Sequence, residues 1–263
     1  MQRLSDLHLA QRAALAGAVL GMDYFRRVKE LPIDLKADGS IVTEADLRVE
    51  QLVRSVLLAE RPDDACLGEE TGQQGTGRRR WILDGIDGTA VFVQAQPSRQ
   101  TLIALEEDGL ITVAIASVPA HGKIWWAERG GGTHVGTIQG QDLVHPRRHQ
   151  VGAAPTSVEA SQLGIVPDYD SLSPTYRAVV DNLVAQARLT KWDVPASLLL
   201  ASGELDIVVQ LAGKVWDFAA PSLIVEEAGG VFSGTDGQAH PVFGNAVYSR
   251  NAHLHSAALA LLA

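Results

Sequence analysis

Residues 84–89 read Asp84-Gly85-Ile86-Asp87-Gly88-Thr89, and this short stretch says most about how the chain folds. It follows the apolar run Trp81-Ile82-Leu83, which predicts a short buried strand. Two carboxylates three positions apart, at a strand end in a glycine-bearing turn, can converge on one point. Carboxylate oxygens are the ligands that Mg²⁺ prefers, and Mg²⁺ commonly sits between a few carboxylates and a substrate phosphate. The stretch therefore predicts a turn where a metal ion meets a phosphate, with the amides of Gly88 and Thr89 facing the anion.

The composition is that of an ordinary globular protein. The 263 residues are 46% hydrophobic and 20% charged, enough for one large domain or two intimate halves with a real core. The net charge of −9 argues against nucleic-acid partners, which are held by clustered Lys and Arg. Part of that negative charge is expected at a metal site, where bound cations offset it.

Compartment and membrane association follow from equally simple features. Cys66 is the single cysteine, so an internal disulfide is excluded and nothing indicates an oxidising compartment. The apolar run Ala13–Leu20 is flanked by charged residues, which favours an amphipathic helix over a signal peptide. Apolar runs also fall short of the roughly 20 residues of a membrane span. We expect a cytoplasmic protein without membrane association.

The first half is expected to combine helices with an antiparallel meander. Helices are predicted over residues 4–30 and from just after Thr43 to about Glu60, the second opened by the capping-box pattern Thr43-Glu44-Ala45-Asp46. Strands are predicted at 101–105, 111–118 and 123–127, with Asp108-Gly109 as a hairpin turn. Gly130-Gly131-Gly132 is expected to break the meander, and residues 145–149 are expected to be loop.

The second half alternates helices and strands. Helices are predicted at 174–187, 197–202 and 218–228, followed by a final strand and a C-terminal helix. A strand is predicted at 205–211, and Asp217 is expected to be the N-cap of the helix that follows it. This pattern indicates a layered α+β architecture.

Carboxylates occur at element ends in four separated segments: Thr43–Asp46, Glu69-Glu70, Asp84 with Asp87, and Trp216-Asp217. Each has an ordinary explanation when taken alone, as a surface pair, a helix cap or a polar turn. Their order along the chain and the residues that surround them are more specific. Gly-Glu-Glu, then Trp-Ile-Leu-Asp-x-Ile-Asp-Gly-Thr, then Trp-Asp-x-Ala-Ala ahead of Glu-Ala-Gly-Gly resembles the inositol monophosphatase superfamily.

The resemblance runs from Lys36 to Gly230, nearly the whole chain. Residues 101–105, 125–130 and 191–193 are most similar to histidinol-phosphate phosphatases of that fold. It implies a layered α-β-α-β-α sandwich of the inositol monophosphatase and fructose-1,6-bisphosphatase type. It also implies one phosphatase domain over residues 1–263, with halves of about 1–140 (metal loop and antiparallel sheet) and 141–263 (substrate specificity).

The same resemblance implies a Mg²⁺-dependent phosphoric monoester hydrolase with two to three Mg²⁺ per site. Glu69, Asp84 and the carbonyl of Ile86 would hold one ion, Asp84, Asp87 and Asp217 the second, and Glu69 would support a weaker third. Phosphoryl transfer to water needs such charge neutralisation together with a positioned nucleophile. Crowded acids would repel one another when empty, so the site is expected to need divalent ions for order as well as rate.

The remaining implied roles concern water, phosphate and assembly. Asp46 and Thr89 would hydrogen-bond the attacking water, and Glu70 would orient it. The amides of Gly88 and Thr89 would bind phosphate oxygens. Superfamily members commonly form homodimers, and an exposed Trp of the pair Trp125-Trp126 is the contact we expect.

Three positions depart from the superfamily pattern beside the phosphate loop. Gly85 replaces a proline, so the turn has more backbone freedom to lose on ordering, about 1 kcal/mol, and weaker metal affinity is expected. Ala90 and Val91 replace a polar pair and remove hydrogen-bonding groups next to the phosphate. A non-catalytic binding relative is therefore a competing hypothesis.

Substrate choice is expected to depend on Trp192, Asp193 and Gln210, at positions that face the leaving group in this superfamily. The first expectation is a small phosphorylated metabolite such as histidinol phosphate. The alternative is a paralogue acting on an inositol phosphate, a sugar phosphate or a nucleotide. Gln210 in place of a common acid weakens the case for a cationic substrate, whereas Asp193 suits a cationic or hydroxyl-rich one.

Overall fold

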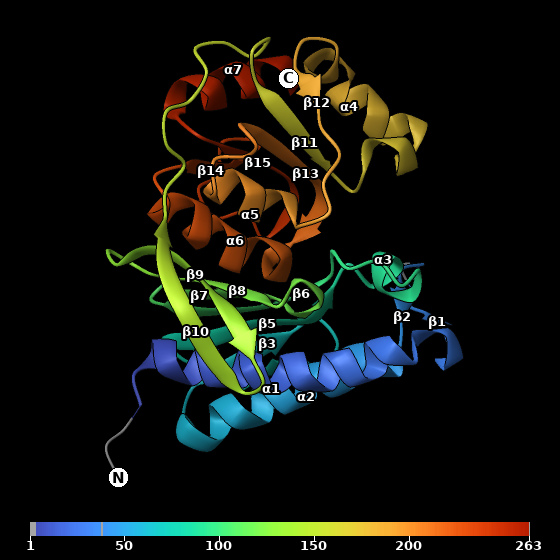
Figure 1. Cartoon of the computed structure of the whole chain (residues 1–263), viewed down its shortest axis with the longest axis vertical. Coiled ribbons are helices and arrows are strands. Elements are labelled where there is room, and N and C mark those ends of the chain that lie inside the picture. Colours follow the sequence, from blue (N-terminus) through green and yellow to red (C-terminus); the bar gives the residue numbers. More distant parts are fainter. Residues whose placement is uncertain (1–3, 38, 263) are drawn as a thin grey trace.

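The computed structural model of the chain describes residues 4–37 and 39–262. Helices and strands alternate in layers, α-β-α-β-α, which confirms the expected architecture (Figure 1). Among the described residues, none of the helices has both the length and the apolarity needed to cross a membrane.

Two long antiparallel helices form the outer layer below the first sheet in Figure 1: α1 (Asp6–Arg26) and α2 (Glu44–Glu60). The predicted helix over 4–30 ends earlier, and the short 3-10 helix η1 (Val28–Glu30) follows it. The capping box of α2 is confirmed, because Oδ2 of Asp46 accepts the amide of Thr43 at 2.8 Å. Between the helices, β1 (Asp34–Leu35) pairs with β2 (Ile41–Val42).

The first sheet has eight strands in the order β10-β9-β8-β7-β6-β5-β3-β4. The pair β3–β5 is parallel and the other neighbours are antiparallel. Its strands are β3 (Ala65–Gly68), β4 (Gly72–Gln74), β5 (Arg79–Asp87), β6 (Gln100–Glu107), β7 (Leu110–Val118), β8 (Lys123–Glu128), β9 (Gly132–Gln139) and β10 (Asp142–His149). The short helices α3 (Thr89–Val93) and η2 (Pro119–His121) lie in its connections.

The predicted meander of β6, β7 and β8 is confirmed, but its predicted end is wrong. Gly130 and Gly132 take positive φ in a tight turn that leads into β9, so the glycines continue the sheet. Residues 145–149, expected as loop, belong to β10. This edge strand tolerates Pro146 because the register shifts between Val144 and Arg147. The sheet thus extends past residue 140, the boundary expected between the two halves.

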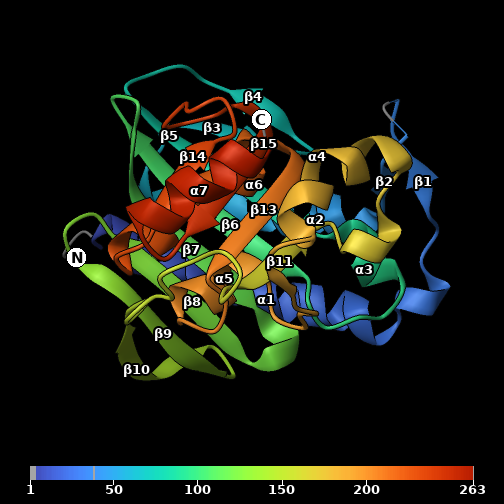
Figure 2. The same ribbon diagram turned by 90° about the horizontal axis from the view of Figure 1, so that it is seen from above.

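The remaining layers lie above the first sheet in Figure 1. They begin with a middle helical layer of α5 (Ala196–Ala201) and α6 (Val215–Glu227), in which α6 covers the first sheet and α5 packs against α6 and the second sheet. The second sheet has the order β12-β11-β13-β15-β14, with β11 (Gln162–Val166), β12 (Arg188–Leu189), β13 (Ile207–Lys214), β14 (Val231–Gly234) and β15 (Phe243–Ser249). Its outer face carries α4 (Pro174–Val184) and α7 (Ala252–Leu262), as Figure 2 shows from above, and η3 (Tyr169–Ser171) precedes α4.

The buried side chains form three clusters that match these layers. Along β13, Ile207 and Val209 face α4 and α7, whereas Val208 faces the core shared with α5 and α6. Trp125 and Trp126 alternate in the same way and pack into different clusters. Both indoles are buried, at 4% and 8% exposure, so the expected exposed tryptophan is wrong and offers no dimer contact.

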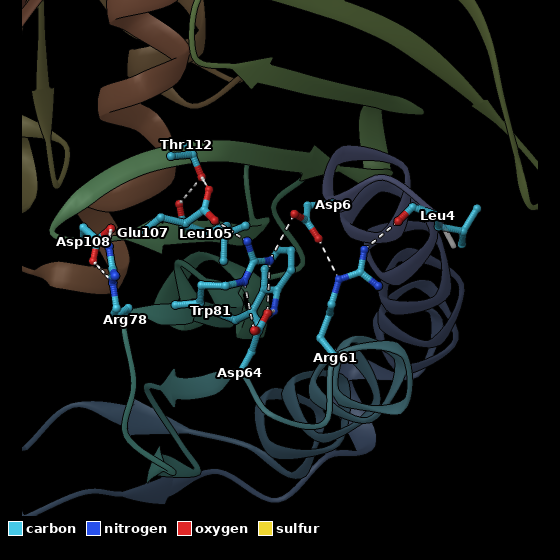
Figure 3. Close-up of polar contacts among 11 residues, drawn as sticks. Leu4, Asp6, Arg61, Asp64, Arg78, Trp81, Leu105, Glu107, Asp108 and Thr112 are labelled. Atoms are coloured by element: carbon cyan, nitrogen blue, oxygen red, sulfur yellow. Dashed lines mark hydrogen bonds and ion pairs between the residues drawn. The ribbon is translucent and has the colours of Figure 1, made fainter. Parts of the chain in front are cut away.

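An ion-pair cluster ties the first layer to the start of β5 (Figure 3). Arg79 contacts Asp64 at 2.9 Å and Asp6 at 3.0 Å, and the indole of Trp81 donates to Asp64 at 3.0 Å. Asp6 also pairs with Arg61 at 2.8 Å, just after α2. The helices are therefore fixed to the start of the strand whose other end carries Asp84 and Asp87.

Candidate active site

Three aspartates from distant parts of the chain converge at the end of β5. Asp84, Asp87 and Asp217 each offer a carboxylate oxygen, and these oxygens lie within 4.8 Å of one another. The first two come from β5, where the pairing with β6 shifts register between them, and Thr101 donates to the Gly85 carbonyl at 2.8 Å in that irregularity. A β-bulge re-aims side chains in this way.

The third aspartate comes from the first turn of α6. The helix begins at Val215, three residues before the predicted start, so Asp217 is not the N-cap. Its Oδ2 accepts the amide of Lys214, the N-cap residue, at 2.6 Å. The carboxylate is thereby fixed at the helix start, facing the end of β5.

Each of the three carboxyl groups has a raised pKa. Burial is the main cause for Asp84, whose pKa lies well above the usual range, with further contributions from Glu69, Asp87 and Asp217. Burial also raises the pKa of Asp87 to about 6, although a hydrogen bond from Gln100 works against it. The pKa of Asp217 rises to about 8, through burial first and the charge of Asp87 second. Without a cation, this cluster holds protons that a metal ion would displace.

Glu69 and Glu70 lie in the turn between β3 and β4, beside the aspartates. Glu69 is not part of the 4.8 Å group found among residues 4–37 and 39–262. Instead Lys36 bridges the two glutamates, with Nζ 2.8 Å from Glu69 and 2.5 Å from Glu70. Burial works to lower the pKa of Lys36, but the bonds to both carboxylates outweigh it and raise the pKa. The lysine thus supplies positive charge where the sequence predicted a metal ligand.

Glu50 supports this turn from α2 and was missed by the sequence reasoning. Its side chain is buried, and its carboxylate accepts the amides of Glu70 at 3.0 Å and Thr71 at 2.8 Å, as well as the Thr71 hydroxyl. A signal was present in the sequence, because Glu50 lies four residues after Asp46 on the face of α2 that buries Val49 and Val53.

Asp46 and Thr89 are joined by a hydrogen bond just after the end of β5. The Thr89 hydroxyl donates to Oδ1 of Asp46 at 2.7 Å, and Oδ2 of Asp46 accepts the Thr43 hydroxyl at 2.6 Å. Burial raises the pKa of Asp46, although these hydrogen bonds act to lower it. Gly88 takes φ +85° at the start of α3, and the Ile86 carbonyl lies 3.3 Å from the Thr89 hydroxyl. The predicted water- and phosphate-binding groups are therefore neighbours.

Beside the aspartates lies a cavity of about 520 Å³. Trp192 and Gln210 line it together with Asp87, Gly88 and Asp217. The indole of Trp192 donates to the Ile165 carbonyl at 3.1 Å, and Oε1 of Gln210 accepts the Tyr248 hydroxyl at 3.1 Å. Ala90 and Val91 also line the cavity, so the loss of polar groups there faces the site.

Asp193 is not brought into this constellation. Its side chain is exposed and does not line the cavity, and its backbone carbonyl lies 3.0 Å from Nε2 of His121. The substrate contact expected for Asp193 therefore remains a prediction without a place in this arrangement.

The donor set fits a hard divalent cation. Asp84, Asp87 and Asp217 offer only oxygen, and nitrogen or sulfur ligands are absent from the group formed by the described residues. Such all-oxygen sets suit Mg²⁺, Ca²⁺ or Mn²⁺ better than Zn²⁺ or copper. The raised pKa values point the same way, since burial and the mutual repulsion of these carboxylates favour a bound positive charge.

Known proteins are similar to this chain in sequence and in fold. The model of the inositol monophosphatase family matches residues 5–263. A protein named glucose-1-phosphate thymidylyltransferase from Streptomyces griseus is 39% identical, covering 86% of this chain and 84% of that protein. A histidinol-phosphatase from Streptomyces coelicolor is 37% identical over 98% of this chain and 97% of its own.

A solved structure shows the same architecture. The extragenic suppressor protein suhB of Bartonella henselae superimposes with a TM-score of 0.83 at 25% identity, covering 97% of each chain. The names of these relatives disagree on substrate. The solved structure agrees with this chain in fold, and the family match covers the complete set of acids described above. The chain belongs to the inositol monophosphatase family and is a phosphoric monoester hydrolase.

Proposed function

We propose that the chain is a Mg²⁺-dependent phosphomonoesterase that hydrolyses a small soluble metabolite. The observation that carries this proposal is the convergence of Asp84, Asp87 and Asp217, with oxygens within 4.8 Å, beside a cavity of about 520 Å³ that Asp87 and Asp217 line. A cluster of this kind suits two-metal phosphoryl transfer, and the cavity suits a ligand of metabolite size.

The acids divide the metal binding among them. Asp84, Asp87 and Asp217 would hold Mg²⁺, with Glu69 and the Ile86 carbonyl completing a set of two to three ions. The bound ions would neutralise phosphate charge and lower the pKa of the attacking water. Nζ of Lys36 lies 2.8 Å from the Glu69 carboxylate and 2.5 Å from the Glu70 carboxylate, so the lysine restrains the turn that carries both side chains.

Asp46 and Thr89 orient the nucleophile. The Thr89 hydroxyl donates to Oδ1 of Asp46, so its oxygen lone pairs face outward as acceptors for a water proton. The Thr43 hydroxyl donates to Oδ2 of Asp46, and the Asp46 carboxylate stabilises the positive charge that develops on the Thr89 hydroxyl as it accepts a proton from water. The amides of Gly88 and Thr89 would bind phosphate oxygens, and Glu70 would orient the water.

The cavity favours an uncharged alcohol as leaving group. Its charged lining residues are Asp87, Asp168 and Asp217. Asp87 and Asp217 belong to the aspartate cluster, and the charge of Asp168 is paired with Lys191 at 2.8 Å. Gln210 contributes an amide where an acid would favour a cation. We therefore infer a phosphate ester whose alcohol part is neutral and hydroxyl-bearing, such as an inositol or sugar phosphate or a nucleotide.

A second candidate substrate is histidinol phosphate. The Streptomyces coelicolor relative, which covers nearly the whole chain, is named for that activity. A cationic amino alcohol would then have to bind without a dedicated acid at position 210, with Trp192 as the cation-binding surface.

Phosphate release from a panel of esters separates these candidates. Inositol 1-phosphate, a hexose phosphate, a nucleoside monophosphate and histidinol phosphate are assayed with Mg²⁺ and with EDTA. We expect Mg²⁺-dependent release, with kcat/KM at least about tenfold higher for a neutral alcohol, a difference of about 1.4 kcal/mol. The opposite preference supports histidinol phosphate. Release unaffected by EDTA, or from none of the esters, contradicts the proposed function.

We further propose a cytoplasmic location and a homodimer. The location rests on the single cysteine, buried in β3, and the dimer on the resemblance to the family. Sedimentation at micromolar concentration tests the assembly, and a monomer would refute it.

A further inference from the structure

Gln100 is the first residue of β6 and the cross-strand neighbour of Asp87. Its side chain is 5% exposed, and its Nε2 donates to Oδ2 of Asp87 at 2.6 Å. It also lines the cavity that holds Asp87 and Asp217. No residue pattern in the sequence marked this glutamine, because only the strand register brings it to the aspartate.

The orientation of the amide follows from chemistry. An ionised carboxylate only accepts hydrogen bonds, so the NH₂ end of Gln100 has to face Asp87. Its Oε1 is then left buried, and it has no hydrogen-bond partner among residues 4–37 and 39–262. A buried acceptor without a partner is unfavourable, and an apolar side chain of similar size would avoid that cost. Packing alone therefore does not account for a glutamine here.

The hydrogen bond to Asp87 explains why a glutamine occupies position 100. A carboxylate held on Oδ2 by Gln100 cannot rotate freely, and the Gly88 amide bonds to the same carboxylate. Groups that hydrogen-bond to metal-binding side chains fix their orientation in this way. We propose that Gln100 is a positioning residue, which holds the Asp87 carboxylate in the orientation that binds the divalent cation. This inference rests on the proposed function, since it assumes that Asp87 binds metal.

Binding of Mn²⁺ without substrate tests the inference apart from turnover. Free Mn²⁺ is followed by its electron paramagnetic resonance signal for the wild type, Gln100→Met, Gln100→Leu and the exposed control Gln139→Met. Methionine and leucine keep the bulk and remove the donor. We expect about tenfold weaker Mn²⁺ binding for both Gln100 variants and a 10- to 100-fold lower kcat/KM, with no change for the control. Mn²⁺ binding within twofold of the wild type in either folded variant overturns the proposal.

A measurement on the unchanged site covers the case in which neither variant folds. The side-chain NH₂ resonances of Gln100, assigned in the ¹⁵N spectrum of the wild type, are followed during titration with Mg²⁺. We expect them to shift on titration, and to move in Asp87→Asn without metal. Resonances that respond to neither change overturn the proposal. Mn²⁺ binding that is unaffected by Asp87→Asn contradicts the proposed function instead, so the two failures are distinguishable.

Discussion

The Thr89 hydroxyl donates a 2.7 Å hydrogen bond to Oδ1 of Asp46, across 43 residues of sequence. Asp46 is fixed in turn by the amide and hydroxyl of Thr43, at 2.8 and 2.6 Å, in the capping box of α2. The helix cap and the contact that we propose for catalysis thus share one carboxylate. It holds the start of α2 to the loop at Gly88 and Thr89.

Replacing Thr89 by valine removes the hydroxyl and keeps the shape. We expect kcat to fall by about 10²- to 10⁴-fold, the usual contribution of a group that manages a proton. The binding of Mn²⁺ should stay unchanged, because the hydroxyl is not among the metal-binding groups. Thr89→Ser restores the hydroxyl and should recover most of the rate. A valine variant with wild-type kcat would show that water is oriented elsewhere.

Glu50→Gln should destabilise the protein and disturb the Glu69-Glu70 turn. The buried carboxylate accepts hydrogen bonds from two backbone amides and one hydroxyl. The NH₂ group of a glutamine would instead place a second donor opposite one of these donors, and that hydrogen bond would be lost. We expect the free energy of unfolding to fall by about 2–4 kcal/mol, measured by urea denaturation. The exposed Glu44→Gln on the same helix is the matched control, expected within about 0.5 kcal/mol of the wild type. Equal stability of both variants would contradict the structural role of Glu50.

The raised pKa values of Asp87, about 6, and Asp217, about 8, predict a pH dependence with a definite sign. Between their unfolded values near 3.8 and these folded values, the native metal-free protein binds more protons than the unfolded chain. This contribution to stability is fully present below pH 3.8 and is lost as the pH rises through 6 and 8.

Thermal denaturation in EDTA from pH 5 to 8.5 measures that loss. The wild type should lose stability relative to Asp217→Asn as the pH rises, because asparagine does not titrate. Mg²⁺ affinity should rise over the same interval, since bound protons have to leave. A constant difference between wild type and variant would mean that Asp217 is already ionised without metal.

The backbone of α2 lies so close to Gly85 that a side chain has no room there. A Cβ added there would lie 2.7 Å from the carbonyl oxygen of Asp46 and 2.9 Å from the amide nitrogen of Glu50. These are backbone atoms, so Gly85→Ala has to push α2 away and stretch the contact between Asp46 and Thr89. We expect about 1–3 kcal/mol lower stability and reduced kcat. Gly77→Ala, whose Cβ would have no neighbour closer than 3.8 Å, is the control. Equal effects of the two substitutions would contradict the close approach.

The layers and the metal loop could be predicted from the sequence because their signals are local. The capping box at Thr43, the hairpin at Asp108-Gly109 and the alternation of β6 to β8 each depend on neighbouring residues. The error at Gly130–Gly132 has a physical reason. Glycine marks a tight turn within a sheet as readily as the end of one, and pairing with β9 decides between them.

Contacts between distant segments could not be read in the same way. Lys36 reaches Glu69 and Glu70 from the β1–β2 hairpin, and Gln100 meets Asp87 only through the register of β5 and β6. The exposure of Asp193 likewise follows from the path of the chain into α5. The family pattern in the sequence predicted the acids, whereas the residues that hold them in place became visible only in the tertiary structure.

We propose that Asp217, from the second half of the chain, completes a cation site with Asp84 and Asp87. Mg²⁺ titration of phosphate release by Asp217→Asn, against the preferred ester, tests it most directly. We predict a half-saturating Mg²⁺ concentration raised by more than the roughly 10- to 100-fold typical of outer-shell changes, with a lower kcat at saturation. Release at the wild-type rate, with an unchanged Mg²⁺ dependence, would contradict the claim.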